Sequence, residues 1–385
     1  MDTAHTLLFL IIIVAAAKLA GGLSERLGQP AVLGELGVGV ALSFTPLKEA
    51  AGDPAITFLA AIGIILLLFE TGLESELDEL RHVGISAGLV AVVGVVLPML
   101  AGFGVLLAVE GDYRHALFVG AILTATSVGI TARVLSDLGQ TNSKEARIIL
   151  GAAVIDDILG LLILGVVLQI VAAGRPDAFA IVRSGVLSIG FLVLAIWLGM
   201  RLAPKLISLA QRLRVRGILV TTAFVYCIGL AYLAEQVGLA EIVGAFAAGL
   251  VLATTDDRVH IQTQVRPITD IFIPVFFVLV GLQVRLGQLN PLEPGQRSML
   301  LVGLALLVLA VLGKLAAGVG VTNRGVNRMA VGAGMVPRGE VGLIFASIGL
   351  REGLLPPDLY AVMVLIVFIS TLVGPFWLKR ALRSK

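Results

Sequence analysis

The sequence has few charged residues, few aromatic residues, one cysteine and four histidines. Charged residues make up 14% of the 385 residues, against about 25% in a soluble domain, so the chain lacks the polar side chains needed to cover a water-facing surface. Aromatic residues make up only 6%, whereas hydrophobic residues make up 58% and glycine occurs 45 times. The hydrophobicity is therefore mainly aliphatic, which is typical of closely packed membrane helices.

Other scarcities exclude further classes of protein. The single cysteine, Cys227, excludes a disulfide framework, and its apolar neighbours favour a small buried residue. The four histidines have no spacing typical of a metal site, and no cofactor is expected. A net charge of +2 is too small to favour nucleic acid as a partner. Residues 1–6 contain no Lys or Arg, so we expect a retained first helix and no cleaved signal peptide.

Long apolar stretches follow one another along the whole chain. A membrane helix needs about 20 mainly apolar residues, and this length predicts an all-α integral membrane protein with about thirteen transmembrane helices. The expected spans are 6–24, 30–45, 55–73, 84–108, 115–137, 145–171, 180–207, 216–235, 240–255, 267–284, 298–322, 326–350 and 358–380.

The distribution of Lys and Arg predicts the orientation of these spans. With the N-terminus outside, the inner loops hold 18 Lys and Arg residues and the outer loops hold 7. Positive residues concentrate on the cytoplasmic side of membrane proteins. We therefore expect a multi-pass protein of the inner (plasma) membrane, with the N-terminus outside and the C-terminus in the cytoplasm.

Two of the expected spans are interrupted by polar residues, glycine or proline. Residues 124–131 of the fifth span read TATSVGIT, and residues 332–342 of the twelfth read GAGMVPRGEVG. Glycine weakens a helix and Pro337 removes a backbone donor, so an unwound segment is expected in each span. The two spans are seven apart and cross the membrane in opposite directions. Such a pair is typical of inverted repeats around a transporter's central site.

Asp156 and Asp157 lie side by side near the middle of the sixth span. A charge at the bilayer centre costs from about 2.5 to well over 10 kcal/mol, so two neighbouring carboxylates indicate a function. Burial and mutual repulsion make it costly to charge both at once. The pair therefore suits a site that holds either a cation or protons.

Three further residues are candidates for the same site. Lys314 lies inside the eleventh span, where an ion pair with one of the aspartates is the simplest arrangement. Thr126 and Ser127 offer hydroxyl oxygens beside the expected break, and hard cations prefer oxygen ligands. We predict that Asp157 is the central ligand of a transported Na⁺, with Asp156, Thr126 and Ser127 around it.

Arg338 and Glu340 follow Pro337 at the break of the twelfth span. Their opposite charges are expected to compensate the ends of the broken helices where these cross. The remaining intramembrane acids, Glu35, Glu70, Glu241 and Asp270, have no obvious partner and are expected to be structural or gating residues.

On these residues the chain resembles the monovalent cation:proton antiporter-2 family, and within it the bacterial NapA-type Na⁺/H⁺ antiporters. The matching segments are ATSVGITARV at 125–134, IILGAAVIDD at 148–157, GK at 313–314 and PRGEVGL at 337–343. The likeness runs essentially from end to end. Glu70 is a departure, because this position is usually apolar in such proteins.

The resemblance implies an NhaA-like fold with two broken crossing helices, a mobile core domain and a dimerisation domain. The core corresponds to residues 84–171 and 298–380, the dimer or scaffold domain to 6–73 and 216–284, and a linker helix to 180–207. It implies that Asp157 carries the cation and the proton and that Asp156 pairs with Lys314. It also implies a homodimer that exchanges two protons per Na⁺, electrogenically and by alternating access, in pH homeostasis.

Other readings of the sequence stay open. A K⁺/H⁺ antiporter of the same family is the nearest, although gated K⁺-efflux systems usually carry a further nucleotide-binding domain. An intramembrane aspartate enzyme is more distant: Asp256 and Asp257 form a second acidic pair but lack the Asp at plus four that a prenyltransferase needs. A passive channel has no need of a titrating carboxylate near a lysine. Lithium is a possible second substrate beside Na⁺.

Overall fold

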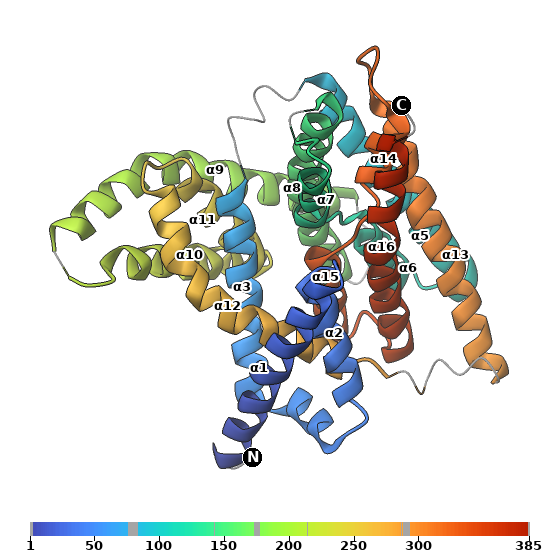
Figure 1. Cartoon of the computed structure of the whole chain (residues 1–385), viewed down its shortest axis with the longest axis horizontal. Helices are drawn as coiled ribbons and strands as arrows, with labels where there is room; N and C mark the ends of the chain where they lie inside the picture. The colour runs from blue at the N-terminus through green and yellow to red at the C-terminus, as the bar shows by residue number, and fades with distance from the viewer. Residues whose placement is uncertain are drawn as a thin grey trace. The chain divides into compact units, whose positions relative to one another are not determined.

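The computed structural model describes residues 3–75, 84–141, 143–172, 178–213, 215–285, 287 and 293–383 (Figure 1). The described chain is helical and contains no β-strand, which confirms the predicted fold class. Helices lie in each of the thirteen stretches that the sequence predicts. By its internal contacts the chain divides into two compact units.

Unit 1 comprises Met1–Leu27, Gly34–Asp78 and Leu168–Gln283. Its helices, including most of α2, are α1 (Thr3–Arg26), α2 (Ala31–Leu42), the 3₁₀ helix η1 (Pro46–Gly52), α3 (Pro54–Glu74), α9 (Ala178–Arg212), α10 (Ile218–Gln236), α11 (Glu241–Ala253) and α12 (Arg258–Leu282).

Unit 2 comprises Gly28–Leu33, Glu79–Val167 and Val284–Lys385. Its helices, including most of α8, are α5 (Ile85–Glu110), α6 (Tyr113–Thr124), α7 (Val128–Asp137), α8 (Lys144–Ala172), α13 (Pro294–Ala316), the 3₁₀ helix η3 (Ala317–Gly320), α14 (Arg328–Gly334), α15 (Glu340–Arg351) and α16 (Pro357–Arg383).

Glycine allows the helices of unit 1 to pack at short distances. A Cβ atom on Gly72 of α3 would lie 2.3 Å from the carbonyl oxygen of Phe246, and one on Gly249 of α11 would lie 2.1 Å from that of Phe69. The two helices therefore touch backbone to backbone. This use of small residues replaces the hydrophobic effect, which does not drive helix association inside lipid.

In unit 2, an apolar core lies where α5, α7, α8, α14 and α16 meet. It includes the buried side chains of Val90, Leu135, Ile149, Met335 and Leu378. This core fixes the two short helices α7 and α14 against the long helices around them. Packing in this core therefore fixes the positions of the two helices next to the breaks, α7 and α14.

Ten helices are long and apolar enough to cross a membrane, by length and composition and within the part of the chain that the structure describes. The pair α2 and η1 passes the same test with a bend of 111° between them, while α11 is shorter, with 13 residues. The prediction of thirteen crossings therefore stays a prediction, although every predicted stretch is helical.

Two expected spans differ at their ends from the observed helices. Helix α12 begins at Arg258, nine residues before the expected start at residue 267, and α9 extends to Arg212. The apolar window detects only the part of a helix that suits lipid, whereas backbone hydrogen bonding continues through the polar residues next to it. Pro267 lies inside α12 and does not begin it.

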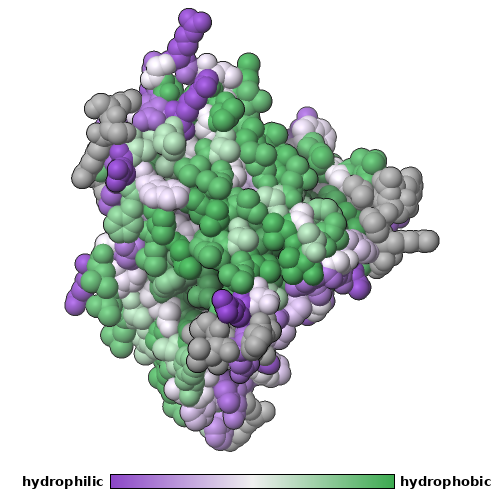
Figure 2. Space-filling view, turned by 90° about the vertical axis from the view of Figure 1, so that its right-hand side faces the viewer, coloured by the Kyte–Doolittle hydropathy of each residue, from purple (hydrophilic) through white to green (hydrophobic). Residues whose placement is uncertain are grey.

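The molecular surface fits a membrane setting. The face shown in Figure 2 is mostly hydrophobic, with hydrophilic residues mainly toward its margins. Large exposed apolar side chains are numerous and include Leu100, Leu301, Leu304 and Phe376. A broad exposed apolar area on a single chain marks a surface that contacts lipid or another protein.

Candidate functional site

The two interrupted helices meet in unit 2, as the sequence predicts. Helix α6 ends at Thr124 and α7 begins at Val128, while α14 ends at Gly334 and α15 begins at Glu340. The backbone N–H of Ser127 donates to the carbonyl oxygen of Pro337 at 2.8 Å. One backbone N–H of the first break and one backbone carbonyl of the second break therefore satisfy each other across the crossing.

Close approach at this crossing depends on two glycines. A Cβ atom on Gly339 would lie 2.7 Å from the Ser127 Oγ, and one on Gly374 of α16 would lie 2.6 Å from the Pro337 ring. The φ of Gly339 is −135°, which other residues also adopt, so space and not backbone strain requires glycine there. In the pattern GMVPRGE, the proline therefore interrupts the helix, and the small size of Gly339 allows the close approach of Ser127.

Hydroxyl groups of the first broken span bond to the second. The Thr131 Oγ1 donates to the carbonyl oxygen of Gly334 at 2.8 Å, and the Ser127 Oγ donates to the Glu340 Oε2 at 3.2 Å. The Thr126 Oγ1 makes a long contact of 3.4 Å with the Met335 carbonyl oxygen. Thr126 and Ser127 are both buried, with 1% of their surface exposed, so their oxygens are available only to ions or water inside the protein.

Opposite charges lie at opposite ends of the short helices. The buried Arg338 side chain donates through Nη2 to the carbonyl oxygens of Leu123, in the last turn of α6, and Ala310 of α13, at 2.7 and 3.1 Å. Glu340 is the first residue of α15. A cation at a helix C-terminus and an anion at a helix N-terminus both complement the helix dipole. This geometry fits the charge compensation expected of Arg338 and Glu340.

Arg338 has further interactions that the sequence does not reveal. The Thr371 hydroxyl donates to the Arg338 carbonyl oxygen, and Thr371 lies in an apolar helix where nothing in the pattern marks it. The Arg338 Nε and Nη1 atoms are buried and have no hydrogen-bond partner among the described residues. Two donors are therefore left near the site, where a buried unpaired donor is costly.

Asp156 and Lys314 form an ion pair in the interior of unit 2. The Lys314 Nζ lies 2.8 Å from the Asp156 Oδ1, and the side chains are 0% and 1% exposed. Gly94 of α5 lies against the lysine, and a Cβ atom there would be 3.8 Å from Nζ, in ordinary van der Waals contact. The second carboxylate oxygen, Oδ2, is buried without a hydrogen-bond partner among the described residues.

Asp157 differs from its neighbour. Its side chain is 4% exposed, and among the residues that the structure describes it forms no ion pair and accepts no hydrogen bond. Asp156, Glu340 and Lys314 are the charged groups that act on it. A buried carboxylate without a fixed partner suits exchange between a proton and a cation, because neither has to displace a strong existing contact.

The remaining sequence candidates lie in unit 1. Glu35 is buried in α2, Glu70 is partly buried in α3 beside Thr269, and Lys18 pairs with Asp270 at 3.7 Å. The described residues contain no group of three or more His, Cys, Asp or Glu side chains able to hold a metal. In unit 2, the oxygen atoms near the two helix breaks are those of the buried aspartates, of the hydroxyl groups and of the backbone carbonyls.

Known proteins resemble this chain over nearly its full length. The family profile described as "Sodium/hydrogen exchanger, transmembrane" matches residues 10–384. The high-affinity Na⁺/H⁺ antiporter NhaS3 of Synechocystis is 39% identical over 98% of this chain and 89% of its own length. The Na⁺/H⁺-K⁺ antiporter GerN of Bacillus cereus is 36% identical over 97% of this chain and 95% of its own.

A solved structure resembles the fold at a lower level of identity. The sodium proton antiporter MjNhaP1 of Methanocaldococcus jannaschii superposes with a TM-score of 0.75, and the match covers 99% of each chain. Its sequence identity is 18%, so the likeness concerns the fold alone.

Proposed function

The chain belongs to the sodium/hydrogen exchanger family, and from that premise we propose that it exchanges Na⁺ for H⁺ across the membrane by alternating access. The observation that carries this proposal is the Asp157 carboxylate, which is buried, is acted on by the charge of Glu340 at the second helix break, and has no fixed partner among the described residues. Relatives at 35–39% identity over nearly the whole chain bear the name Na⁺/H⁺ antiporter. We therefore propose a transporter and not an enzyme.

In this mechanism Asp157 carries the two ions in turn. A proton neutralises the carboxylate when the site faces the side of high proton concentration. On the other side, Na⁺ replaces the proton and is held by Asp157, by Asp156 and by the hydroxyl oxygens of Thr126 and Ser127. Coupling follows from competition, because one carboxylate cannot hold a proton and Na⁺ at once.

The Asp156–Lys314 pair accounts for the net charge that moves across the membrane in each cycle. With a 2.8 Å contact between them, any cation that approaches Asp156 weakens the attraction that keeps Lys314 protonated. Loss of that proton on Na⁺ binding would add a second proton to the cycle. We therefore propose electrogenic exchange, with two protons moved per Na⁺.

Unit 2 contains all seven site residues: Thr126, Ser127, Asp156, Asp157, Lys314, Arg338 and Glu340. We propose that unit 2 is the mobile core and that unit 1 is the scaffold through which two copies associate as a homodimer. A core with its ion sealed inside can move as a body without exposing the charges to lipid.

The protein is proposed to act in the plasma membrane, with its N-terminus outside and its C-terminus in the cytoplasm. The excess of 18 over 7 Lys and Arg residues supports this orientation.

Purified protein in liposomes with an imposed pH gradient tests the function directly. Added Na⁺ should dissipate the gradient in liposomes containing the wild-type protein, and the Asp157→Asn variant should lose at least a hundredfold of this rate. Asn has a similar shape but neither binds a proton nor carries a charge. Full activity of Asp157→Asn, with the protein correctly inserted, would contradict the proposed mechanism.

Potassium is the second candidate substrate, because the name of GerN includes K⁺ beside Na⁺ and H⁺. The same liposomes, given NaCl, LiCl or KCl at equal concentrations, separate the two. A Na⁺ response well above the K⁺ response supports the proposed function, whereas equal responses identify a K⁺-accepting exchanger of the same family.

A further inference from the structure

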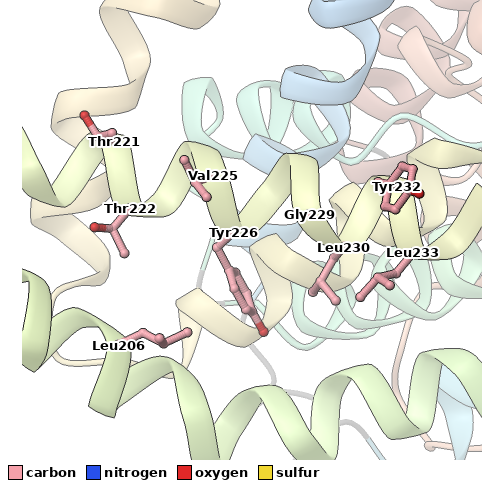
Figure 3. Close-up of a pocket in the computed structure, with 9 residues that line it drawn as sticks. All are labelled: Leu206, Thr221, Thr222, Val225, Tyr226, Gly229, Leu230, Tyr232 and Leu233. Atoms are coloured by element: carbon pink, nitrogen blue, oxygen red, sulfur yellow. The ribbon is translucent and has the colours of Figure 1, made fainter.

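An open groove lies between α9 and α10 in unit 1, and none of its lining residues is used in the transport proposal. Its volume is about 590 Å³. Figure 3 shows Leu206 of α9 on one wall and α10 side chains on the other, with Tyr226 directed from α10 toward α9. The α10 residues in the wall are Thr221, Thr222, Val225, Tyr226, Gly229, Leu230, Tyr232 and Leu233.

The two threonines of the groove lie together at one of its ends. Thr221 and Thr222 lie at the end next to the α9–α10 connection, whereas Leu230, Tyr232 and Leu233 lie toward the other end (Figure 3). At 1.5 Å per residue, the stretch from residue 221 to residue 233 is about 18 Å long. That length is close to the hydrocarbon thickness of one leaflet, which is about 15 Å.

Basic residues gather near the threonine end of the groove, and the two helices that form the groove carry no acid along this stretch. Between residues 178 and 234 the sequence has no Asp or Glu, while Arg201, Lys205, Arg212, Arg214 and Arg216 fall within 16 positions. Lys205, Arg212 and Arg216 are exposed and form no ion pair with any residue that the structure describes. Their charge is therefore available to a ligand outside the chain.

The basic residues of α9 lie on the face of the helix that points away from the protein interior. Arg201, Lys205 and Arg212 lie within about 40° of one another around α9, at 100° per residue. The buried residues Ala203 and Ile207 lie on the opposite face. Asp257 contacts this end of α9, but its carboxylate accepts two hydrogen bonds from Gln211 at 3.2 Å.

We propose that this groove binds an anionic phospholipid of the cytoplasmic leaflet. One acyl chain lies along Val225, Leu230 and Leu233, the ester region lies at the hydroxyls of Thr221 and Thr222, and the phosphate lies between Arg212 and Arg216. A phospholipid fits this surface because its acyl chain is apolar and its phosphate is negatively charged, as the groove and its basic end require. A second protein chain would need an apolar segment that ends in an acidic group to match both parts. The predicted orientation places this end in the cytoplasmic leaflet, whose lipids are the anionic ones.

Native mass spectrometry of the detergent-solubilised full chain tests the headgroup. The protein is titrated with dioleoylphosphatidylglycerol and with dioleoylphosphatidylcholine, which share acyl chains and differ in charge. We expect one phosphatidylglycerol to bind at least tenfold more tightly than phosphatidylcholine. Equal affinities would overturn the proposal.

Charge variants locate the site. Arg212→Gln/Arg216→Gln should weaken phosphatidylglycerol binding at least tenfold and leave phosphatidylcholine unchanged. Arg183→Gln/Arg297→Gln, which removes two exposed charges elsewhere, is the matched control and should stay within twofold of wild type. An equal loss in the control would mean that net charge, and not this site, attracts the lipid.

A third variant fills the groove. A Cβ atom on Gly229 meets nothing within 4 Å, so Gly229→Leu should be accommodated and should exclude the acyl chain of both lipids. Gly185→Leu on α9, where a Cβ atom also meets nothing, is its control. If Gly229→Leu leaves lipid binding unchanged but converts a dimer to a monomer, the groove belongs to a second copy of the chain and the proposal fails.

Discussion

Among the described residues, the apolar helices of each unit contain a Lys–Asp pair, and the two pairs differ in their distance and in their exposure. In unit 2, Lys314 and Asp156 lie 2.8 Å apart and are 0% and 1% exposed. In unit 1, Lys18 and Asp270 lie 3.7 Å apart and are 50% and 60% exposed. A charge with no access to solvent depends on its partner, whereas a half-exposed charge can be stabilised by water or lipid headgroups.

The comparison explains why only one of the pairs is suited to transport. The buried pair lies next to Asp157, so any change of charge at that carboxylate is felt by Lys314 through a medium that screens little. The surface pair is screened on its open side. Identical residue types thus give a coupled site in one unit and a weak surface contact in the other.

Removing the lysine from each pair should show this difference most strongly. Lys314→Met leaves Asp156 buried without a partner, and we expect the free energy of unfolding to fall by about 3 kcal/mol. Lys18→Met should cost less than about 1 kcal/mol, because its pair is exposed and long. Thermal unfolding of both variants in the same detergent measures the two effects, and comparable losses would contradict the contrast drawn between the units.

The two lysines should also differ in their effect on the net charge moved per transport cycle. In liposomes under a Na⁺ gradient, Lys314→Ala should change the exchange from electrogenic to electroneutral, because the second proton is lost with the amine. A membrane potential clamped with K⁺ and valinomycin should then no longer alter the rate of exchange. Lys18→Ala should keep the voltage response of the wild type. A voltage-dependent Lys314→Ala variant would exclude the lysine as a proton carrier.

Much of the site could be predicted from local sequence. The polar run 124–131 and the glycines and proline of 332–342 weaken a helix wherever they occur, so both breaks were predictable. Asp156, Asp157 and Lys314 are conspicuous because charge is costly in an apolar span. The same argument about unpaired charge predicts that Lys314 pairs with one of the two aspartates, whereas the choice of Asp156, 158 positions away, followed only from the family resemblance.

Other features depend on tertiary contacts that no local pattern encodes. Thr371 bonds to the Arg338 backbone from α16, where it follows Ser370 in a mainly apolar stretch, and nothing in the sequence indicates which distant residue it contacts. The early start of α12 at Arg258 was missed because hydropathy identifies the lipid-facing part of a helix and not its hydrogen bonding. The division into two units also needs long-range contacts, since each unit collects separate parts of the chain.

The glycines of the two units should also respond differently to substitution. Gly339→Ala places a methyl group against Ser127 at the crossing, and we expect about a tenfold loss of transport in a protein that still folds, because overpacking costs about 1–3 kcal/mol. Gly249→Ala meets rigid backbone between α3 and α11 and should reduce the yield of folded protein. Adding Ser127→Gly should partly restore the maximal rate of Gly339→Ala at saturating Na⁺, since it removes the opposing Cβ and Oγ atoms. No restoration would mean that Gly339 acts through another contact.

The smallest expected effect concerns a single hydroxyl group. Ser127→Ala removes the oxygen that donates to Glu340, and we expect a rise of about threefold to tenfold in the KM for Na⁺ with little change in maximal rate, as for the loss of one neutral ligand or hydrogen bond. Ser188→Ala is the matched control, because Ser188 is equally buried in α9 of unit 1 and its hydroxyl has no hydrogen-bond partner among the described residues. Its KM should not change. Rates measured over a range of Na⁺ concentrations separate the two parameters, and a fall in maximal rate without a change in KM would place Ser127 in the motion of the helices and not in the ion's coordination.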